Sequence, residues 1–383
     1  MGGQPGPDSV NDNVRWSAVN PQLLPGDSVH RYNAPVLTKA DHQTSAARLS
    51  SKQLCGVLLP ITTPFHDQDG LDLNGLRVNI ARWSGTGISG YVILGSTGER
   101  VHLDEREYLE VIEAAREEVA TVRDGLALIV GAGQQSTRGT INEIKRVAKV
   151  FIDAVLVITP HFYRSAITQE ALIEHYKHVA DESPVPVILY SMPALTGIKI
   201  EPGTIARLSE HPNIIGVKDS SADIEGLRET VKLVRHNSDK GSSQAPDGRD
   251  DFAVLTGNGT VLYEALQVGA DGAILAVGCV APQLCLEIFR AVKNGKDERA
   301  QLLQKTLTPL AHAVTTRYGI GGLKAALDFI GYFGGPVRAP LPSPDEAARR
   351  EIFGLLQEAQ ATLSEQPSTS AERSSSIPEV VLP

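Results

Sequence analysis

The sequence has few of the features that mark several large classes of protein. Its three cysteines, Cys55, Cys279 and Cys285, form no C-x-x-C pair, and their odd number argues against a disulfide framework. No run of about 18 apolar residues occurs, so we expect no membrane span. Lys and Arg number 36 against 45 Asp and Glu, a net charge of -9, and no basic stripe appears. We therefore expect no nucleic-acid partner.

The cysteines and the N-terminal composition also bear on the compartment. Three scattered thiols fit a reducing environment, so we expect a cytoplasmic protein. The N-terminal segment carries basic residues such as Arg15 and Arg31, but also acidic residues such as Asp8 and Asp12. Mitochondrial transit peptides are poor in acidic residues. The acidic residues therefore argue against a mitochondrial transit peptide, and a mitochondrial location is kept only as the alternative.

Both ends of the chain differ in composition from its middle. Residues 1–52 and 363–383 are rich in small and polar residues, which predicts disordered or loosely attached extensions. Between them, eight short apolar runs alternate with stretches that space apolar residues at helical intervals. This alternation is typical of a parallel sheet covered by helices. The runs are 56–62, 90–96, 127–133, 154–160, 186–193, 214–220, 253–259 and 272–278.

Eight such units predict an α/β fold, the (β/α)8 TIM barrel, over residues 53–296. Further helical patterns predict a C-terminal helical extension over 297–362, and the polar stretch 237–251 predicts a surface loop. The segment GTGISG (85–90) follows a helix and precedes a strand. A dinucleotide-binding loop needs the reverse order, so this segment predicts no nucleotide site.

The stretch NIIGVKDSSAD (213–223) runs from a short apolar strand straight into Lys218. Lysine is almost never fully buried without a partner, because burial disfavours its charged form. Lys218 is therefore either a nucleophile or one half of an ion pair with a neighbour such as Asp219 or Asp223. Tyr190 lies at the end of the strand expected in the preceding run, 186–193. Since adjacent parallel strands lie about 4.8 Å apart, Tyr190 and Lys218 can share one pocket.

That pocket would lie at the carboxyl ends of the strands, where TIM barrels carry their active sites. A neutral amine there attacks a ketone to give an imine, and a nearby phenol can move the protons. The pair therefore predicts a lyase that acts through a lysine Schiff base without a metal. After the second run, Gly95 and Gly98 bracket Ser96 and Thr97. Such a turn can present N–H groups and two hydroxyls to a small carboxylate.

The segments GSTGE (95–99), YSMPALTG (190–197) and GVKDSS (216–221) together resemble the dihydrodipicolinate synthase/N-acetylneuraminate lyase family of class I pyruvate aldolases. The resemblance covers residues 53–362. It implies that Lys218 forms the Schiff base, that Tyr190 shuttles protons, and that Ser96 and Thr97 bind the pyruvate carboxylate. It also implies a small 2-oxoacid and an aldehyde as substrates, no dissociable cofactor, no metal, and a homotetramer built as a dimer of dimers.

Within this family, the segments 211–223 and 313–341 look most like eukaryotic 4-hydroxy-2-oxoglutarate aldolase. That enzyme cleaves its substrate to pyruvate and glyoxylate. Dihydrodipicolinate synthases generally carry an arginine for the aldehyde's carboxylate where this chain has Leu195. Because arginine suits a bidentate carboxylate contact, Leu195 argues against that synthase. An aldolase for 2-keto-3-deoxy sugar acids and a dihydrodipicolinate synthase-like enzyme remain the alternatives of the same fold.

Two positions depart from the family pattern. Phe162 stands where many members carry a tyrosine that reaches across the dimer interface, and the adjacent Tyr163 is a candidate to replace it. Thr97 stands where the aldolase subgroup tends to have asparagine. The second carboxylate of a hydroxyoxoglutarate also needs a partner, for which the candidates are Ser220, Arg164 and Arg100.

Other readings compete with this one. The chain could be a non-catalytic relative that binds a 2-oxoacid and acts as a regulator. The loss of the interface tyrosine favours that hypothesis mildly, whereas the intact set of Lys218, Tyr190 and Ser96 argues against it. We expect Lys324 to be a lysine on a helix surface. His175 and His178 lie three residues apart on a predicted helix, but no third ligand accompanies them. We therefore expect a solvated helix face there rather than a metal site.

Overall fold

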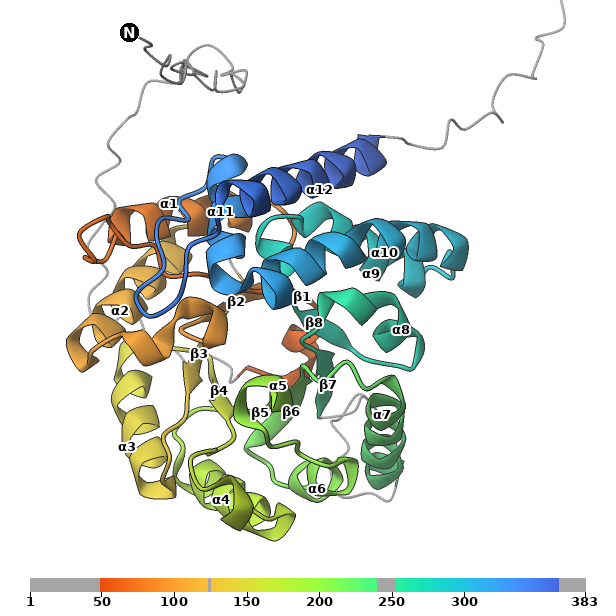
Figure 1. The fold of residues 1–383 in the computed structure, drawn as a ribbon. Coiled ribbons are helices and arrows are strands. Elements are labelled where there is room, and N and C mark those ends of the chain that lie inside the picture. The colour runs from red at the N-terminus through yellow and green to blue at the C-terminus, as the bar shows by residue number, and fades with distance from the viewer. Residues whose placement is uncertain (1–48, 123–124, 240–251, 365–383) are drawn as a thin grey trace, which may run out of the picture. The chain divides into compact units, whose positions relative to one another are not determined.

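The structure is a computed structural model, and it describes residues 49–122, 125–239 and 252–364. In this part of the chain, eight parallel strands close into a barrel in chain order, and β8 pairs with β1 (Figure 1). The predicted TIM barrel is confirmed. The strands are β1 (Gly56–Pro60), β2 (Gly90–Ile93), β3 (Ala127–Ala132), β4 (Ala154–Ile158), β5 (Val187–Ser191), β6 (Ile214–Asp219), β7 (Ala253–Thr256) and β8 (Gly272–Ile274).

Each strand lies within one predicted apolar run but is shorter than the run, because the last residues of each run leave the sheet. The second run shows how this happens. β2 ends at Ile93, and Leu94 then adopts a φ of 54°, outside the β region. The chain thus turns at the mouth of the barrel, and the residues GSTGE follow as a turn rather than as strand.

The strand side chains divide into two apolar layers. One buried cluster fills the barrel and takes residues from every strand, among them Leu58, Ile188 and Tyr190. A larger cluster, which includes Leu59 and Leu189, lies between the strands and the helices. The alternation follows from the two-residue period of a strand. It puts Tyr190 on the inner face of the barrel.

The surrounding helices begin where the sequence supplies caps. The Asp104 carboxylate accepts from the Glu107 N–H at 2.8 Å, and the Glu107 carboxylate accepts from the Asp104 N–H at 3.1 Å. This capping box opens α2. The helices are α1 (Leu73–Ser84), α2 (Glu105–Thr121), α3 (Thr137–Val147), α4 (Gln169–Glu182), α5 (Pro193–Thr196), α6 (Pro202–Leu208), α7 (Ile224–Asp239), α8 (Leu262–Gln267), α9 (Pro282–Lys293), α10 (Asp297–His312), α11 (Gly319–Phe329) and α12 (Glu346–Ser364).

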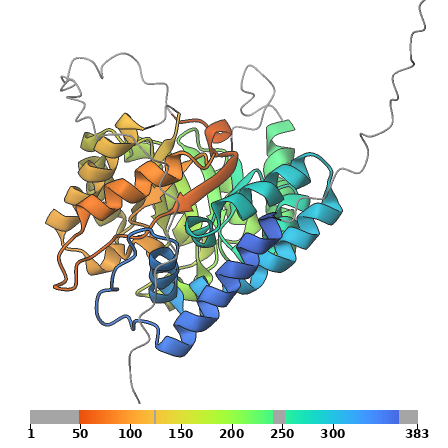
Figure 2. The same ribbon diagram turned by 90° about the horizontal axis from the view of Figure 1, so that it is seen from above.

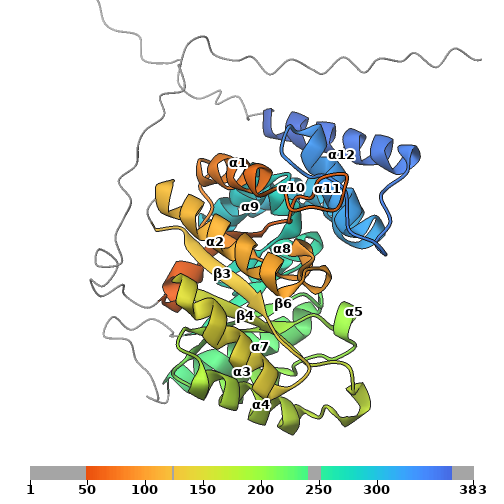
Figure 3. The same cartoon turned by 90° about the vertical axis from the view of Figure 1, so that its left-hand side faces the viewer.

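The helices after β8 form a layer on one side of the barrel. α10 packs on α9, and α12 packs on both α10 and α11. Figures 1 and 3 show α11 and α12 on the side of α1, away from α3 and α4, and Figure 2 shows α12 running along α10. A π-helical turn, Ala313–Arg317, separates α10 from α11. None of the helices that the structure describes has the length and apolar character that crossing a membrane requires.

Two surface predictions were wrong. Lys324 is 1% exposed, because α11 is apolar on most sides and the segment after it covers the lysine. On α4, His178 is exposed, but His175 is buried and its Nδ1 lies 2.9 Å from the Thr137 hydroxyl of α3. Burial lowers the pKa of His175 to about 4.

The predicted terminal extensions lie mostly outside the described residues, as does most of the predicted surface loop, of which only 237–239 are described, at the end of α7. Of the N-terminal segment, residues 49–52 are described. There, Leu49 packs with the cluster inside the barrel, and the short helical turn Ser51–Leu54 follows it.

Candidate active site

Lys218 and Tyr190 lie side by side at the carboxyl ends of β6 and β5. The two residues are directly paired across the parallel ladder. The Lys218 Nζ lies 4.5 Å from the centre of the Tyr190 ring, and the two residues are 5% and 4% exposed. A strand end is a rigid support, so the amine and the phenol are held in one largely dry pocket.

The turn after β2 brings a third polar group to this pair. The Ser96 Oγ lies 3.4 Å from the Tyr190 Oη, at the long end of hydrogen-bonding distance. Ser96 belongs to a short helical turn, Ser96–Gly98, preceded by Gly95. The first N–H groups of such a turn have no acceptor within it, so Ser96 and Thr97 can offer them to an anion.

Both flanks of this turn have unusual backbone conformations. Leu94 and Glu99, on either side of Gly95–Gly98, each have a φ of 54°, in the left-handed region that non-glycine residues rarely adopt. The buried Thr63 hydroxyl donates to the Gly98 carbonyl at 2.7 Å and fastens the turn to the end of β1. Backbone strain of this kind persists only where the surroundings enforce it, and it concentrates at functional sites.

A glycine after β7 makes room for Lys218, a role that no local sequence pattern indicates. A Cβ added to Gly257 would lie 2.6 Å from the Lys218 Cε and 1.9 Å from the Ser220 Oγ. The Gly257 N–H also donates to the Asp219 carbonyl at 2.6 Å, so the backbone is pinned to β6 at this level. The glycine therefore permits the close approach of the Lys218 and Ser220 side chains to the backbone after β7.

The ion-pair alternative for Lys218 finds no support among the described residues. Asp223 pairs instead with Lys199, with 2.7 Å between carboxylate and ammonium. Asp219 accepts from the Ser221 N–H at 2.7 Å, and burial raises the pKa of its carboxyl. Within the described part of the chain, Lys218 makes no ion pair. The Tyr190 ring and Gly257 lie beside its side chain.

The model of the dihydrodipicolinate synthetase family matches residues 53–359, which include the whole barrel and most of the helical layer. The chain belongs to this family. Its members are lyases of the class I aldolase type, which work through a Schiff base on a lysine. The family assignment from the three motifs is thus confirmed.

The alignments with individual relatives cover nearly the full length of each relative. The 4-hydroxy-tetrahydrodipicolinate synthase of Methanothrix thermoacetophila is 34% identical over 301 residues, 78% of this chain and 95% of the relative. The dihydrodipicolinate synthase structure from Thermotoga maritima has a TM-score of 0.71 and 29% identity, covering 80% of this chain and 99% of that one. YagE from E. coli K12, a family member solved with pyruvate, has a TM-score of 0.71 and 28% identity, covering 80% and 98%.

The two arginine candidates for the second carboxylate differ sharply. Arg100 points to α3, where its guanidinium pairs with the buried Glu143 carboxylate and lies 5.2 Å from the Tyr108 ring centre. Arg164 is exposed, and its side chain lies against Gly197, where an added Cβ would be 2.8 Å from its Nη1. Gly197 ends the short helix α5 that carries Leu195. The Arg100 guanidinium is therefore already paired with Glu143, whereas Arg164 lies beside α5, the short helix that carries Leu195.

In the described chain, Tyr163 does not contact the cluster formed by Lys218, Tyr190 and Ser96, which we call the Lys218 cluster. It is 70% exposed, and its ring packs edge-on against that of Phe162, which is 73% exposed, at a centre-to-centre distance of 5.0 Å. The two rings form an exposed aromatic pair on the loop after β4. Among the described residues, no hydrogen bond links Tyr163 to Ser96 or Tyr190.

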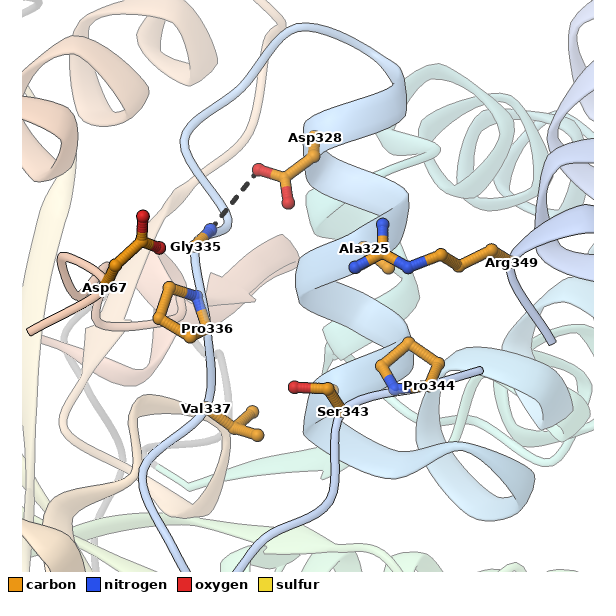
Figure 4. A pocket seen from close by; sticks show the side chains of 10 residues that line it. Asp67, Ala325, Asp328, Gly335, Pro336, Val337, Ser343, Pro344 and Arg349 are labelled. Carbon is orange, nitrogen blue, oxygen red and sulfur yellow. Dashed lines mark hydrogen bonds between the residues drawn. The ribbon is translucent and has the colours of Figure 1, made fainter. Parts of the chain in front are cut away.

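A half-open cavity of about 230 Å³ lies elsewhere in the described chain. It is formed between α11, the start of α12 and the segment 335–337, and none of the proposed site residues lines it. Figure 4 shows the Asp328 carboxylate on its wall, accepting from the Gly335 N–H at 3.3 Å, with Arg349 reaching in from α12. In the described ranges, no group of three or more His, Cys, Asp or Glu side chains could hold a metal ion.

Proposed function

We propose that this protein is a pyruvate-type aldolase in which Lys218 forms the Schiff base and Tyr190 and Ser96 move protons. The observation that carries the proposal is the pairing of Lys218 and Tyr190 across two strand ends, with Ser96 touching the phenol. The carboxylate of the 2-oxoacid binds at the Gly95–Gly98 turn, through the N–H groups and hydroxyls of Ser96 and Thr97. The Ser220 hydroxyl lines the same pocket.

The reaction then follows from the amine. The Lys218 Nζ adds to the C2 carbonyl of a 4-hydroxy-2-oxoacid, and water leaves to give the imine. Removal of the C4 hydroxyl proton breaks the C3–C4 bond, whose electron pair moves into the imine to give an enamine, and C4 leaves as an aldehyde. Protonation at C3 and hydrolysis release pyruvate and restore the amine. Tyr190, in contact with Ser96, is the group suited to carry these protons.

The proposed substrate is 4-hydroxy-2-oxoglutarate, with glyoxylate as the aldehyde product. Its second carboxylate requires a cation, and we assign that role to Arg164. Three features support the assignment: the side chain is exposed, it lies against Gly197, and the competing Arg100 is paired with Glu143. Arg164, from the loop after β4, would thus bind the carboxylate that an arginine at the position of Leu195 would bind in dihydrodipicolinate synthases.

A second candidate acceptor is aspartate semialdehyde, because the relative from Methanothrix thermoacetophila described above is named 4-hydroxy-tetrahydrodipicolinate synthase. A third acceptor, glyceraldehyde, represents the 2-keto-3-deoxy sugar acids, for which hydroxyl contacts would matter more than a second cation. All three acceptors share the Lys218 chemistry. They differ in the group that must face the far end of the substrate.

We also propose a homotetramer built from dimers, in which the loop after β4 lies at an interface. Support comes from the exposed Phe162–Tyr163 pair, since aromatic residues are enriched at interfaces. In such an assembly Tyr163 would serve a neighbouring site as a proton relay in place of the tyrosine absent at Phe162. Tyr163→Phe should then lower kcat without changing the oligomeric state measured by light scattering.

The test of the core proposal is reductive trapping. Borohydride added with pyruvate should leave a covalent adduct on Lys218, found by peptide mass spectrometry. The adduct should vanish in Lys218→Ala and persist in Lys199→Ala, a nearby lysine engaged with Asp223. An undiminished adduct in Lys218→Ala would refute the mechanism. Pyruvate binding without adduct or turnover would favour the non-catalytic regulator.

The test of specificity is an acceptor panel. Glyoxylate, aspartate semialdehyde and glyceraldehyde are compared by consumption of pyruvate, in the wild type and in Arg164→Met. The proposal expects glyoxylate to be preferred and Arg164→Met to weaken the reaction with glyoxylate more than that with glyceraldehyde, because glyoxylate carries a carboxylate and glyceraldehyde does not. Arg207→Met is the control, since Arg207 is a surface residue paired with Glu170 on α4.

A further inference from the structure

Glu99 closes the turn that carries Ser96 and Thr97. Its backbone is left-handed, with φ 54° and ψ 31°, and its N–H donates to the Ser96 carbonyl at 3.3 Å. Its side chain is fully buried, at 0% exposure. Because one residue supplies both the end of the turn and this carboxylate, movement of the carboxylate would move the turn.

The Glu99 carboxylate is held by groups from the C-terminal part of the chain. Its Oε1 lies 2.6 Å from the Lys324 Nζ of α11. Its Oε2 accepts from the Arg338 backbone N–H at 3.0 Å. His102, from the same loop, lies 3.3 Å away through its Nδ1. Through Glu99, the turn at the mouth of the barrel is thus bonded to Lys324 and Arg338, which lie more than two hundred positions later in the sequence.

Lys324 is as buried as its partner. Its Nζ also donates to the Pro336 carbonyl at 2.7 Å and lies 4.2 Å from the centre of the Phe65 ring. Burial lowers the pKa of this ammonium, and the nearby Glu99 carboxylate acts in the opposite direction. Since water does not reach either group, loss of one leaves the other without compensation, which is costly for a buried charge.

A second buried cation in this region provides a contrast. The Arg338 guanidinium binds the Glu107 carboxylate through two hydrogen bonds of 2.6 and 2.5 Å and the Asp69 carboxylate at 2.9 Å. Neither acid belongs to the Gly95–Gly98 turn. Arg338 therefore attaches the C-terminal segment to the barrel, whereas the ammonium of Lys324 bonds to a residue that is continuous with the turn.

We propose that Lys324 is a positioning residue for substrate. From α11 it fixes the Glu99 carboxylate and thereby orients the Gly95–Gly98 turn toward the carboxylate of the bound 2-oxoacid. This inference rests on the proposed function of that turn. It assigns the C-terminal helical layer a part in substrate binding, beyond its packing on the barrel.

The first experiment uses Lys324→Met, which removes the ammonium and keeps an unbranched side chain. The readout is the pyruvate concentration that gives half-maximal borohydride trapping on Lys218. We expect that concentration to rise about tenfold, because a misplaced turn weakens carboxylate binding. Trapping at saturating pyruvate should change by less than about threefold, since the Lys218 amine itself is untouched. Lys305→Met, the same change at an exposed position of α10, is the control and should match the wild type.

The second experiment asks whether the defect comes from an uncompensated Glu99. In the double variant Glu99→Gln/Lys324→Met, the neutral amide needs no cation and can still accept from the Arg338 N–H. We expect half-saturation to return to within about threefold of the wild type, a non-additive result typical of a directly interacting pair. Should Lys324→Met not fold, Glu99→Gln alone gives the test, with an expected rise in half-saturation of about tenfold; a value within about threefold of the wild type would contradict the positioning role.

The outcomes separate the two proposals. If the wild type traps pyruvate on Lys218 while Lys324→Met lowers only the melting temperature and leaves half-saturation unchanged, the positioning role is overturned and the pair is structural. A double variant whose defect equals the product of the single defects would also contradict it. If the wild type traps no pyruvate, the proposed function itself fails, and the positioning role falls with it.

Discussion

Gly257→Ala tests whether the space around Lys218 is as tight as the structure indicates. The added methyl carbon would lie 2.6 Å from the Lys218 Cε and 1.9 Å from the Ser220 Oγ. The Ser220 hydroxyl can rotate about one bond. Lys218 has less freedom, because its backbone is paired on both sides, with Tyr190 and with Leu255. The backbone of Gly257 cannot retreat easily either, since its N–H is bonded to the Asp219 carbonyl.

The size of the effect follows from these distances. Carbon atoms in contact normally lie about 3.5–4.0 Å apart, so the tip of Lys218 must move by roughly 1 Å. A displacement of about 1 Å at a reacting group costs on the order of a hundredfold in rate. That loss corresponds to about 2.7 kcal/mol of transition-state stabilisation. The extra methyl in a packed site should also lower the unfolding free energy by about 1–3 kcal/mol.

The assay is kcat/KM for pyruvate release, coupled to lactate dehydrogenase, together with the rate of borohydride trapping on Lys218. Gly203→Ala is the matched control. Gly203 lies in α6 with nothing within 4 Å of an added Cβ, so alanine should leave activity unchanged. It should raise stability slightly, by about 0.4–1 kcal/mol, by restricting the unfolded chain.

An activity of Gly257→Ala within threefold of the wild type would refute the reasoning. It would mean that Lys218 can take another conformation without loss, and that the crowding around Gly257 is unrelated to catalysis. A folded, inactive variant that still binds pyruvate reversibly would support it most directly, because binding at the Gly95–Gly98 turn does not require the amine to reach the keto carbon.

Three further predictions concern other parts of the fold. Tyr190→Phe should still give the trapped adduct on Lys218, formed more slowly, and should lower kcat by about 10²–10⁴-fold, because it removes the proton carrier; lost turnover with a persisting adduct is the signature. Arg338→Met should lower the unfolding free energy, measured in urea, by about 3–5 kcal/mol, because it leaves the Glu107 carboxylate half-buried without its cation. His175 has its pKa lowered to about 4 in the folded protein. As pH falls, the unfolded state therefore takes up the His175 proton before the folded state does. The unfolding free energy should fall by about 3 kcal/mol between about pH 6.5 and pH 4. The unfolding free energy of His175→Gln should depend less on pH over the same range.

The barrel and the central pair of the site could be predicted from the sequence because both depend on local patterns. Eight apolar runs give eight strands. Since parallel strands in a barrel follow each other in order, the residues ending the fifth and sixth runs, Tyr190 and Lys218, must be neighbours. No coordinates are needed for that step. The strand ends could not be located to the residue, because they depend on single backbone angles such as that of Leu94.

The buried charges could not be predicted in the same way. Lys324 lies in GLKAALDFIG, a helix with apolar residues on nearly every side, and such a helix is usually buried. That pattern was a signal against a surface lysine. Its partner, however, is Glu99, and no local pattern links two positions so far apart in the sequence. The need for glycine at position 257 could not be predicted for the same reason. It depends on the position of Lys218 on the neighbouring strand, which only the structure gives.

The Gly95–Gly98 turn shows why those distant contacts belong to the chemistry. Leu94 and Glu99 each hold a left-handed conformation, which costs on the order of 1–3 kcal/mol per residue and persists only if the surroundings enforce it. Gly131 of β3 allows it on one flank, since a Cβ there would lie 2.2 Å from the Leu94 carbonyl oxygen. Lys324 enforces it on the other, through the Glu99 carboxylate. A turn constrained on both flanks keeps its N–H groups aimed before substrate arrives, so less of the binding free energy is spent on ordering it. On this reasoning, changes at Gly131 or Lys324 should weaken pyruvate binding although neither residue belongs to the proposed carboxylate-binding turn.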